Sequence, residues 1–312
     1  MSNLRSLGTT LTLLLCGSVL AGCGEDNGGW STVDGAPALL TASHVWAFSP
    51  NDVWILDGTS TIHRYDGAAW STLSTPSTMG LGCIYALSAS EVWLCAGSDV
   101  LHYDGATFTT TNVTGPSGLN TLIALWASSP SDVWAVGDEA IIAHYNGSSW
   151  SGQIVGSPFK SSIWGSGPDD IYAVSTFDLM HYSNGTWTEV DLDAGAGGGG
   201  QVWGTGASDV WLMPDSDQIS HFDGASWETI ELDIVGDLSA VWGPAPDDLW
   251  AAGGAGSIAH YDGSSWDEVT HQEIGAPYLR QLRSVHGTSS SDIWIVGHEL
   301  GEGGATGLIY HR

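Results

Sequence analysis

The sequence repeats one motif seven times, and this repetition limits the possible folds more than any other feature of the chain. A segment similar to Val-Trp-Gly-x-x-Pro-x-Asp-Val-Trp-Ala-Val-Gly is followed, after a variable stretch, by one similar to Ile-x-His-Tyr-Asp-Gly-x-x-Trp. The repeats align on the acidic residue before the Val-Trp pair, which recurs every 38 to 44 positions as Asp52, Glu91, Asp132, Asp170, Asp209, Asp248 and Asp292. A period near 40 residues is typical of arrays in which each unit buries its apolar surface against its neighbours.

All 17 tryptophans of the chain fall into three aromatic columns of the repeat. The first column stands six residues before the acid and comprises Trp46, Tyr85, Trp126, Trp164, Trp203, Trp242 and His286. The second stands two residues after the acid and comprises Trp54, Trp93, Trp134, Tyr172, Trp211, Trp250 and Trp294. The third follows the Asp-Gly or Asn-Gly pair and comprises Trp70, Phe108, Trp150, Trp187, Trp227, Trp266 and, from the N-terminal region, Trp30. We interpret these large aromatic side chains as packing residues between stacked sheets.

Each unit contains four short strands, which we call A to D, and no helical periodicity. In the third unit, strand A leads through a turn at Ser128–Asp132 into strand B at 133–136, and strand C at 142–145 leads into strand D at Trp150. Between strands C and D, Asn146-Gly147 favours a type I′ hairpin turn. Four strands per unit and seven units predict an all-β fold, a seven-bladed β-propeller.

The two ends of the chain complement each other within this scheme. The seventh unit stops inside strand C, at 308–312, and lacks the Asp-Gly-x-x-Trp segment. The missing segment is present near the start of the chain, where Asn27-Gly28-Gly29-Trp30 matches the Asn-Gly-x-Trp of the fourth unit. We therefore expect the N-terminal strand to complete the last blade.

The Asp-Val-Trp-Ala-Val-Gly and His-Tyr-Asp-Gly-Ser-Ser-Trp segments resemble kelch-type and Asp-box-type repeats of the galactose-oxidase-like propellers. The resemblance covers residues 27–312 and implies a fold rather than an activity, because propellers host unrelated functions. The arginine triad of sialidase-like propellers is unlike this chain, whose arginines after the N-terminal segment are Arg64, Arg280, Arg283 and Arg312. Neither the copper site of galactose oxidase nor the adjacent cysteines of quinone-dependent dehydrogenases have a counterpart. Calcium-dependent hydrolase or lactonase chemistry at the axis stays open, since it needs only a few Asp, Glu and Asn side chains.

Strand C carries a histidine column, which comprises His102, His144, His181, His221, His260 and His311, with Arg64 in the first unit. Because equivalent positions of successive blades diverge from one another, these imidazoles cannot converge on one metal. We expect each to be packed and hydrogen-bonded near its hairpin, and we expect the acidic residue to cap backbone N–H groups of the turn between strands A and B. Neither catalytic residues nor metal ligands are predicted.

The first 23 residues have the features of an export signal. Arg5 is followed by an apolar stretch that is too short to cross a bilayer, and then by Leu20-Ala21-Gly22-Cys23. This tetrapeptide resembles the lipobox of bacterial lipoproteins, which implies a lipidated Cys23. We predict a signal peptide at 1–22, a lipidated tether at 23–26 and the propeller at 27–312. Because Gly24 is not Asp, we expect the outer membrane of a Gram-negative cell, with periplasmic or surface display.

Two of the remaining cysteines are predicted to form a disulfide. Cys83 lies two residues before Tyr85 and Cys95 two after Trp93. If that aromatic pair faces across the hairpin between strands A and B, the two sulfur atoms meet on one side of the sheet, within disulfide reach. An oxidising periplasm permits the bond.

Loop length distinguishes the two faces of the predicted ring. The turns between strands A and B and between strands C and D are nearly constant, and both lie on one side, which we call the constant face. The loops between strands B and C and between strands D and A vary, and we call their side the variable face. Surface loops on a rigid scaffold commonly carry binding residues. The non-repetitive side chains there are the candidate binding residues: Phe159, Lys160, His271, Tyr278, Arg280, Arg283, His298 and Glu299.

Charge excludes one class of partner. The chain has 6 Lys+Arg and 35 Asp+Glu, a formal net charge of −29. Removal of residues 1–22 takes away one basic residue and leaves 5 − 35 = −30, which argues against binding to a nucleic acid backbone. We therefore expect a lipid-anchored envelope module, monomeric and without a cofactor, that contacts the membrane only through its anchor and binds a protein or a glycan. The alternative is a calcium-type hydrolase or lactonase-like enzyme with its site at the axial mouth.

Overall fold

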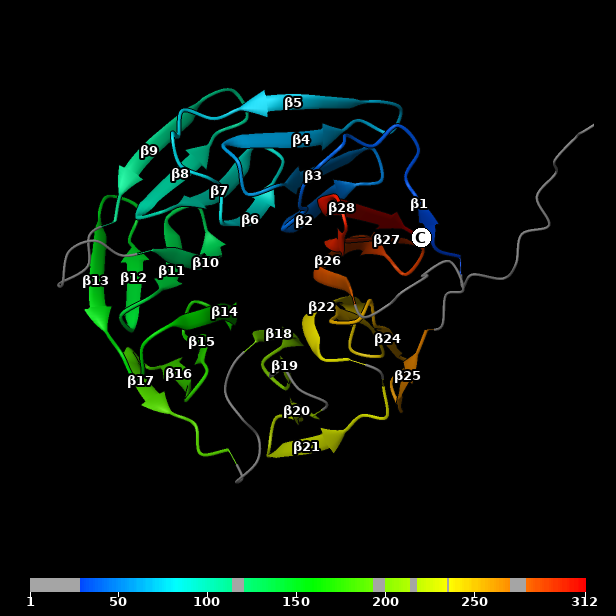
Figure 1. Ribbon diagram of the computed structural model, residues 1–312. Helices are drawn as coiled ribbons and strands as arrows, with labels where there is room; N and C mark the ends of the chain where they lie inside the picture. The colour runs from blue at the N-terminus through cyan, green and yellow to red at the C-terminus, as the bar shows by residue number, and fades with distance from the viewer. Residues whose placement is uncertain (1–28, 114–120, 193–199, 214–217, 235, 270–278) are drawn as a thin grey trace, which may run out of the picture.

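Seven four-stranded antiparallel sheets form a ring in the computed structural model (Figure 1), which describes residues 29–113, 121–192, 200–213, 218–234, 236–269 and 279–312. The secondary structure elements in these ranges are all strands. No helix capable of crossing a membrane occurs in the part of the chain that is described. The all-β, seven-bladed propeller predicted from the repeats is confirmed.

Six blades are each built from one continuous segment, with the strands in chain order across the sheet. Blade 1 comprises β2 (His44–Ser49), β3 (Asp52–Leu56), β4 (Thr61–Tyr65) and β5 (Trp70–Ser74). Blade 2 comprises β6 (Cys83–Ser88), β7 (Glu91–Ala96), β8 (Asp99–Tyr103) and β9 (Phe108–Asn112). Blade 3 comprises β10 (Leu122–Ser129), β11 (Asp132–Gly137), β12 (Ile141–Tyr145) and β13 (Trp150–Ile154).

The next three blades repeat this arrangement. Blade 4 comprises β14 (Lys160–Gly167), β15 (Asp170–Ser175), β16 (Leu179–Ser183) and β17 (Thr186–Glu189). Blade 5 comprises β18 (Gln201–Gly206), β19 (Asp209–Met213), β20 (Gln218–Phe222) and β21 (Trp227–Glu231). Blade 6 comprises β22 (Leu238–Ala245), β23 (Asp248–Gly253), β24 (Ile258–Tyr261) and β25 (Trp266–Glu268).

Blade 7 joins the two ends of the chain. Its strands are β26 (Arg280–Ser289), β27 (Asp292–Gly301), β28 (Gly304–His311) and, on the outer edge, β1 (Ser31–Thr32). Ser31 pairs with His311 and Thr32 pairs with Tyr310, and Figure 1 shows β1 beside β28. The expected completion of the last blade by the N-terminal strand is therefore present.

The turns between strands C and D differ from the predicted type I′ hairpin in most blades. In blade 3, Tyr145 pairs with Trp150, so the turn has four residues, and Asn146 Oδ1 accepts hydrogen bonds from the N–H groups of Ser148 and Ser149. Gly147 alone takes a positive φ there, at 88°. A two-residue turn occurs in blade 4, where Asn184 and Gly185 have φ values of 51° and 78°. The side-chain acceptor replaces backbone geometry as the feature that stabilises the longer turns.

The acidic column binds side chains rather than backbone N–H groups, which corrects the expectation of a turn cap. In blade 5, one oxygen of Asp209 accepts from His221 Nε2 at 2.7 Å and from Trp211 Nε1 at 2.9 Å, and the other accepts from the Thr205 hydroxyl at 2.5 Å. His221 also stacks on Trp211, with ring centroids 3.9 Å apart. Burial alone would raise the pKa of Asp209, but the hydrogen bonds from His221, Thr205 and Trp211 hold it below its usual value. One carboxylate thus connects strands A, B and C of its blade.

In blade 1 the carboxylate of Asp52 connects strands B and C with different side chains. Phe48 stands where blade 5 has its hydroxyl, and Arg64 stands where it has its histidine. The Arg64 guanidinium donates to both oxygens of Asp52, from Nε at 2.7 Å and from Nη2 at 2.9 Å. A bidentate arginine therefore supplies the bonds that two residues supply in blade 5.

The second and third aromatic columns make contacts between neighbouring blades. Trp134 of blade 3 meets Trp187 of blade 4 edge to face at 5.9 Å, and Trp211 of blade 5 meets Trp266 of blade 6 at 5.6 Å. Trp30 is buried and meets Trp250 of blade 6 at 5.5 Å in the same geometry. Trp30 therefore occupies the third-column position of blade 7.

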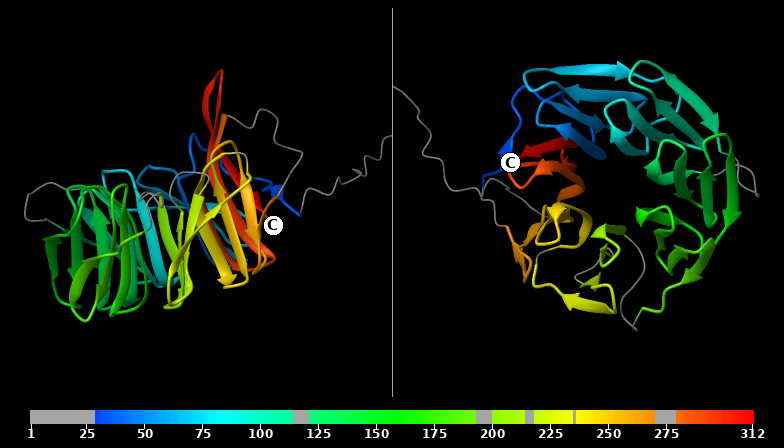
Figure 2. Two further views of the ribbon diagram at one scale, coloured as in Figure 1. Left: turned by 90° about the horizontal axis from the view of Figure 1, so that it is seen from below. Right: turned by 180° about the vertical axis from the view of Figure 1, so that it is seen from behind.

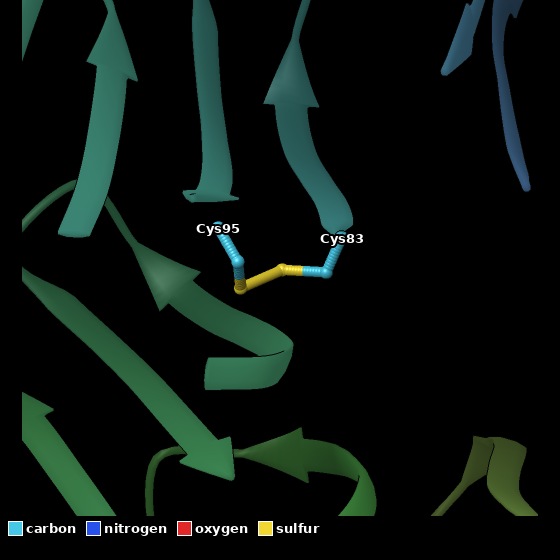
Figure 3. Close-up of a disulfide and its surroundings, with 2 residues drawn as sticks. All are labelled: Cys83 and Cys95. Carbon is cyan, nitrogen blue, oxygen red and sulfur yellow. A yellow bond between two sulfur atoms is a disulfide. The ribbon is translucent and has the colours of Figure 1, made fainter. Parts of the chain in front are cut away.

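A disulfide joins the first two strands of blade 2. Cys83 and Cys95 face each other across β6 and β7, and their sulfur atoms are bonded (Figure 3). Both residues are buried in the cluster that packs blade 2 against blade 3.

Deletion of residues 27–33 should destabilise the ring, because it removes Trp30 and the outer strand of blade 7 and exposes the edge of β28. Loss of a buried tryptophan from a core costs about 3–5 kcal/mol. We expect a lower melting temperature in a circular dichroism scan and greater light scattering on heating. The matched control deletes residues 23–26 only and should melt as a chain beginning at residue 23 does. Equal melting of the two deletion variants would contradict the role assigned to Trp30.

Candidate functional site

The ring encloses an axial cavity of about 360 Å³, lined by the first strand of every blade. Each of β2, β6, β10, β14, β18, β22 and β26 contributes side chains to its wall. Each of these strands begins at the variable face and ends at the constant face, so positions along it correspond to depth in the cavity. A cavity of this size lies within the range of small-ligand sites.

The first aromatic column lines the deeper part of this cavity. Its members pack against small residues of the following blade, as in the pairs Trp126 with Gly165 and Trp164 with Gly204, where a Cβ added to the glycine would lie 2.9 and 2.8 Å from the indole ring. Tyr85 of blade 2 donates its hydroxyl hydrogen to the Ala127 carbonyl of blade 3 at 3.1 Å. The column therefore seals the junctions between blades and also forms an aromatic wall.

His286 of blade 7 completes this aromatic wall between blades 6 and 1. Its ring lies 4.3 Å from the Trp46 ring and 5.5 Å from the Trp242 ring. The Ala47 N–H donates to His286 Nδ1 at 3.2 Å, and the Val45 N–H donates to the Ser284 hydroxyl oxygen at 3.2 Å. Nδ1 is thus an acceptor, so the ring carries its proton on Nε2.

Burial keeps two imidazoles of the cavity wall neutral. It lowers the pKa of His286 to about 3. Burial, assisted by the positive charge of Arg283, lowers the pKa of His44 to about 4. Both rings are therefore uncharged at neutral pH.

Arg283 stands at the mouth of the cavity on the variable face. It precedes Ser284 on β26 and is exposed. Its Nε donates to His298 Nδ1 at 3.3 Å, and His298 on β27 is itself buried. Burial and the nearby Arg283 charge lower the pKa of His298, which favours the neutral acceptor. The two predicted residues Arg283 and His298 are thus brought together by the β26–β27 hairpin.

Arg280 and Glu299 form a second pair on the same hairpin. Arg280 Nε lies 3.2 Å from Glu299 Oε2, and its Nη1 donates to the Tyr310 hydroxyl at 3.0 Å. Glu299 does not belong to an irregular loop, because β27 continues to Gly301 and pairs with β28 throughout. Figure 2 (left) shows the red hairpin of β27 and β28 rising beyond the other blades.

Lys160 was predicted to be a binding residue of the variable face, but its side chain does not reach the surface. Its side chain is fully buried at the start of β14, where Nζ lies 2.5 Å from Asp178 Oδ1 and 2.9 Å from the Ser157 carbonyl oxygen. Burial lowers the pKa of Lys160, while Asp178 opposes this shift. This pair could not be predicted from the repeat, because Asp178 comes from the loop between strands B and C, which differs from unit to unit.

Exposed apolar side chains gather on the variable face. The structure records eight large exposed hydrophobic residues in the described ranges, and seven of them lie in or beside loops of that face: Leu40, Met79, Ile154, Phe159, Phe177, Leu279 and Leu300. The eighth, Leu87, lies beside a turn of the constant face. Phe177 is 70% exposed and Phe159 is 59% exposed. Sequence reasoning named Phe159 and missed Phe177, which interrupts no repeat position.

Three of the predicted site residues, His271, Tyr278 and Cys23, lie outside the described residues. Within those ranges, no group of three or more His, Cys, Asp or Glu side chains lies close enough to hold a metal ion.

Stability should fall as the pH is lowered from about 6.5 to 4. The unfolded chain binds protons at His44 and His286 in this range, whereas the folded chain does not, so acid favours unfolding. Each histidine contributes up to about 1.4 kcal/mol per pH unit. Urea unfolding followed by fluorescence at pH 7.5, 6, 5 and 4 measures the slope. The H286Y variant, which places a tyrosine where blade 2 has Tyr85, should show a smaller slope; identical slopes would contradict this account.

Comparisons with known proteins agree on the architecture. No protein-family model matches the chain, and no curated protein matches its sequence. Among solved structures, YCF48 bound to D1 peptide superposes with a TM-score of 0.68 at 16% identity, covering 92% of this chain and 96% of that one. YCF48 from Cyanidioschyzon merolae gives 0.69 at 13% identity, with 91% and 98% covered. The WD40 β-propeller domain of Doa1 gives 0.70 at 10% identity, with 89% and 95% covered. At these identities the likeness shows a β-propeller fold alone.

Proposed function

We propose that the chain is a lipid-anchored binding module of the bacterial cell envelope that binds a protein partner through its variable face. The observation that carries this proposal is the concentration of exposed hydrophobic side chains on the loops of that face. Exposed apolar side chains that meet a partner are typical of protein interaction sites, and in the described residues those of this chain lie mainly on this face. The constant face offers one such residue, Leu87.

The two most exposed of the phenylalanines are held by one buried ion pair. Asp178 accepts from the Ser157 N–H as well as from Lys160, and therefore joins the loop before β14 to the loop after β15. Phe159 belongs to the first loop and Phe177 to the second. Because the connection is buried, the aromatic side chains are presented from a fixed backbone, which lowers the entropy lost when a partner binds.

A protein partner agrees with what one structural neighbour does. One structural neighbour is YCF48 bound to D1 peptide, so a propeller of this architecture can hold a polypeptide segment. For a chain with 35 acidic and 6 basic residues, a protein surface with apolar and basic groups is a better match than an anionic polymer.

The lipobox-like segment supports attachment at Cys23 and, with it, a location in the outer membrane. Cys23 is seven residue steps from Trp30, a distance of at most about 24 Å when fully extended. The chain enters β1 from the constant face, so a lipid at Cys23 would hold that face toward the bilayer and leave the variable face free for a partner.

Site-specific photocrosslinking tests the binding face. A benzoyl-phenylalanine in place of Phe177 should give crosslinked adducts of defined size in the source cells, and the same probe in place of Leu87 serves as the matched control. Replacement of Phe159 by Ser in the Phe177 probe strain should weaken the adduct several-fold, because it removes a neighbouring apolar contact. Adducts at Leu87 and none at Phe177 would place the binding surface on the other face.

Fluorescence quenching tests the orientation. A fluorophore on a single added cysteine at Ser148, in a turn of the constant face, should be quenched more by bilayer probes than one at Leu300 at the tip of the β27–β28 hairpin. The Cys83–Cys95 disulfide leaves both native thiols unreactive, so the label goes to the added cysteine. Stronger quenching at Leu300 would show that the variable face lies against the lipid.

A further inference from the structure

The described side chains that line the axial cavity include no Asp or Glu, although the chain contains 35 of them. They include one arginine, Arg283, and two neutral histidines, His44 and His286. An anion in this cavity therefore lies near one positive charge and is not next to any carboxylate of the described wall, although the molecule as a whole is acidic. Charges outside the wall act at longer range and are screened over about 8 Å at physiological ionic strength.

Arg283 is positioned so that the end of its guanidinium is available. Its Nε is occupied by His298 Nδ1, which fixes the plane of the group. No carboxylate among the described residues pairs with Arg283, in contrast to Arg64 and Arg280. The two terminal nitrogens therefore keep their donors, and this fork matches the two oxygens of a carboxylate.

The rest of the cavity wall indicates what kind of molecule such a carboxylate would belong to. At the depth of Arg283 the wall carries small polar side chains on two blades, Ser161 and Ser239, together with Gly200 and one apolar side chain, Ile123. Three residues further along each strand, about 10 Å deeper at about 3.3 Å per residue, the first aromatic column begins. A ligand that reaches from the mouth to this depth has a negative end and an apolar or aromatic end.

We infer that the axial cavity is a binding site for a carboxylate with an apolar body, in which Arg283 holds the carboxylate and the first aromatic column contacts the body. The carboxylate belongs either to a free organic acid or to the carboxyl terminus of a polypeptide, since both present the same group. This site is separate from the apolar loops around Phe177, so it stands or falls independently of the protein partner proposed above.

Calorimetric titration of the intact mature protein tests the site with matched probes. Phenylacetate should bind, and phenylacetamide, which has the same shape without the charge, should bind at least about tenfold more weakly, as expected for loss of a charge-assisted hydrogen bond. The R283Q variant should lose the same factor for phenylacetate, and R283K should fall between, because lysine keeps the charge but not the fork. The R312Q variant is the control, since the Arg312 guanidinium lies over the Trp250 ring at the outer part of blade 7.

Two further arms identify the source of the carboxylate. Acetyl-Ala-Ala-Phe with a free carboxyl terminus is compared with its amide, and tighter binding of this acid than of phenylacetate assigns the site to a polypeptide terminus. Equal binding of the charged and amide forms of both probes, or unchanged phenylacetate affinity in an R283Q protein whose melting temperature matches the parent, would overturn the proposal. No binding of either acid up to about 10 mM would also overturn it, because this corresponds to less than about 3 kcal/mol.

Discussion

The propeller depends on the tryptophan of the second aromatic column. Residues of its own blade hold its indole on one side, and on the other side the indole contacts the next blade. Within its blade, Trp211 stacks on His221 and donates a hydrogen bond to Asp209. The plane of the indole is therefore set by a carboxylate and an imidazole that are hydrogen-bonded to each other. On its other side it meets Tyr261 and Trp266 of the next blade at 4.9 and 5.6 Å. Blade geometry and blade packing are therefore coupled through one side chain. Aromatic pairs add about 0.5–1.5 kcal/mol each beyond their area burial, and the ring repeats the contact at successive junctions.

Residues that recur once per unit could be predicted from the sequence, because a repeat constrains equivalent positions at once. The strand order, the completion of blade 7 by Trp30 and the aromatic packing all follow from columns of this kind. The role of the acidic column was predicted incorrectly: a carboxylate before a strand is compatible with a turn cap, and only the positions of three other side chains direct it to an imidazole. The prediction that Lys160 is a binding residue of the variable face was wrong for a related reason. Its partner Asp178 lies in a loop that does not align between the repeats.

The candidate site lies where the symmetry of the ring is broken. At the depth of Arg283, the other blades carry Ser, Gly or Ile, and blade 7 alone carries a charge. The same blade has the histidine in place of a first-column aromatic, the longest inner strands and the projecting hairpin. A repetitive scaffold provides a cavity wall that is the same on every side. Because the residues that differ from the repeat are concentrated in blade 7, one side of the wall differs from the others. Phe159 and Phe177 provide a second departure, on blade 4, roughly opposite blade 7 in the ring.

The completion of blade 7 by a two-residue strand has a mechanical consequence. In a molecule held by its N-terminus, any force on the body enters the fold at Gly29 and reaches first the backbone pairs of Ser31 with His311 and Thr32 with Tyr310. The strand β1 itself contributes only these two backbone pairs, whereas the neighbouring strands β27 and β28 of blade 7 are joined along eight positions. Tension on the tether would therefore detach β1 before any other strand, and it would do so in the blade that holds Arg283 and His286.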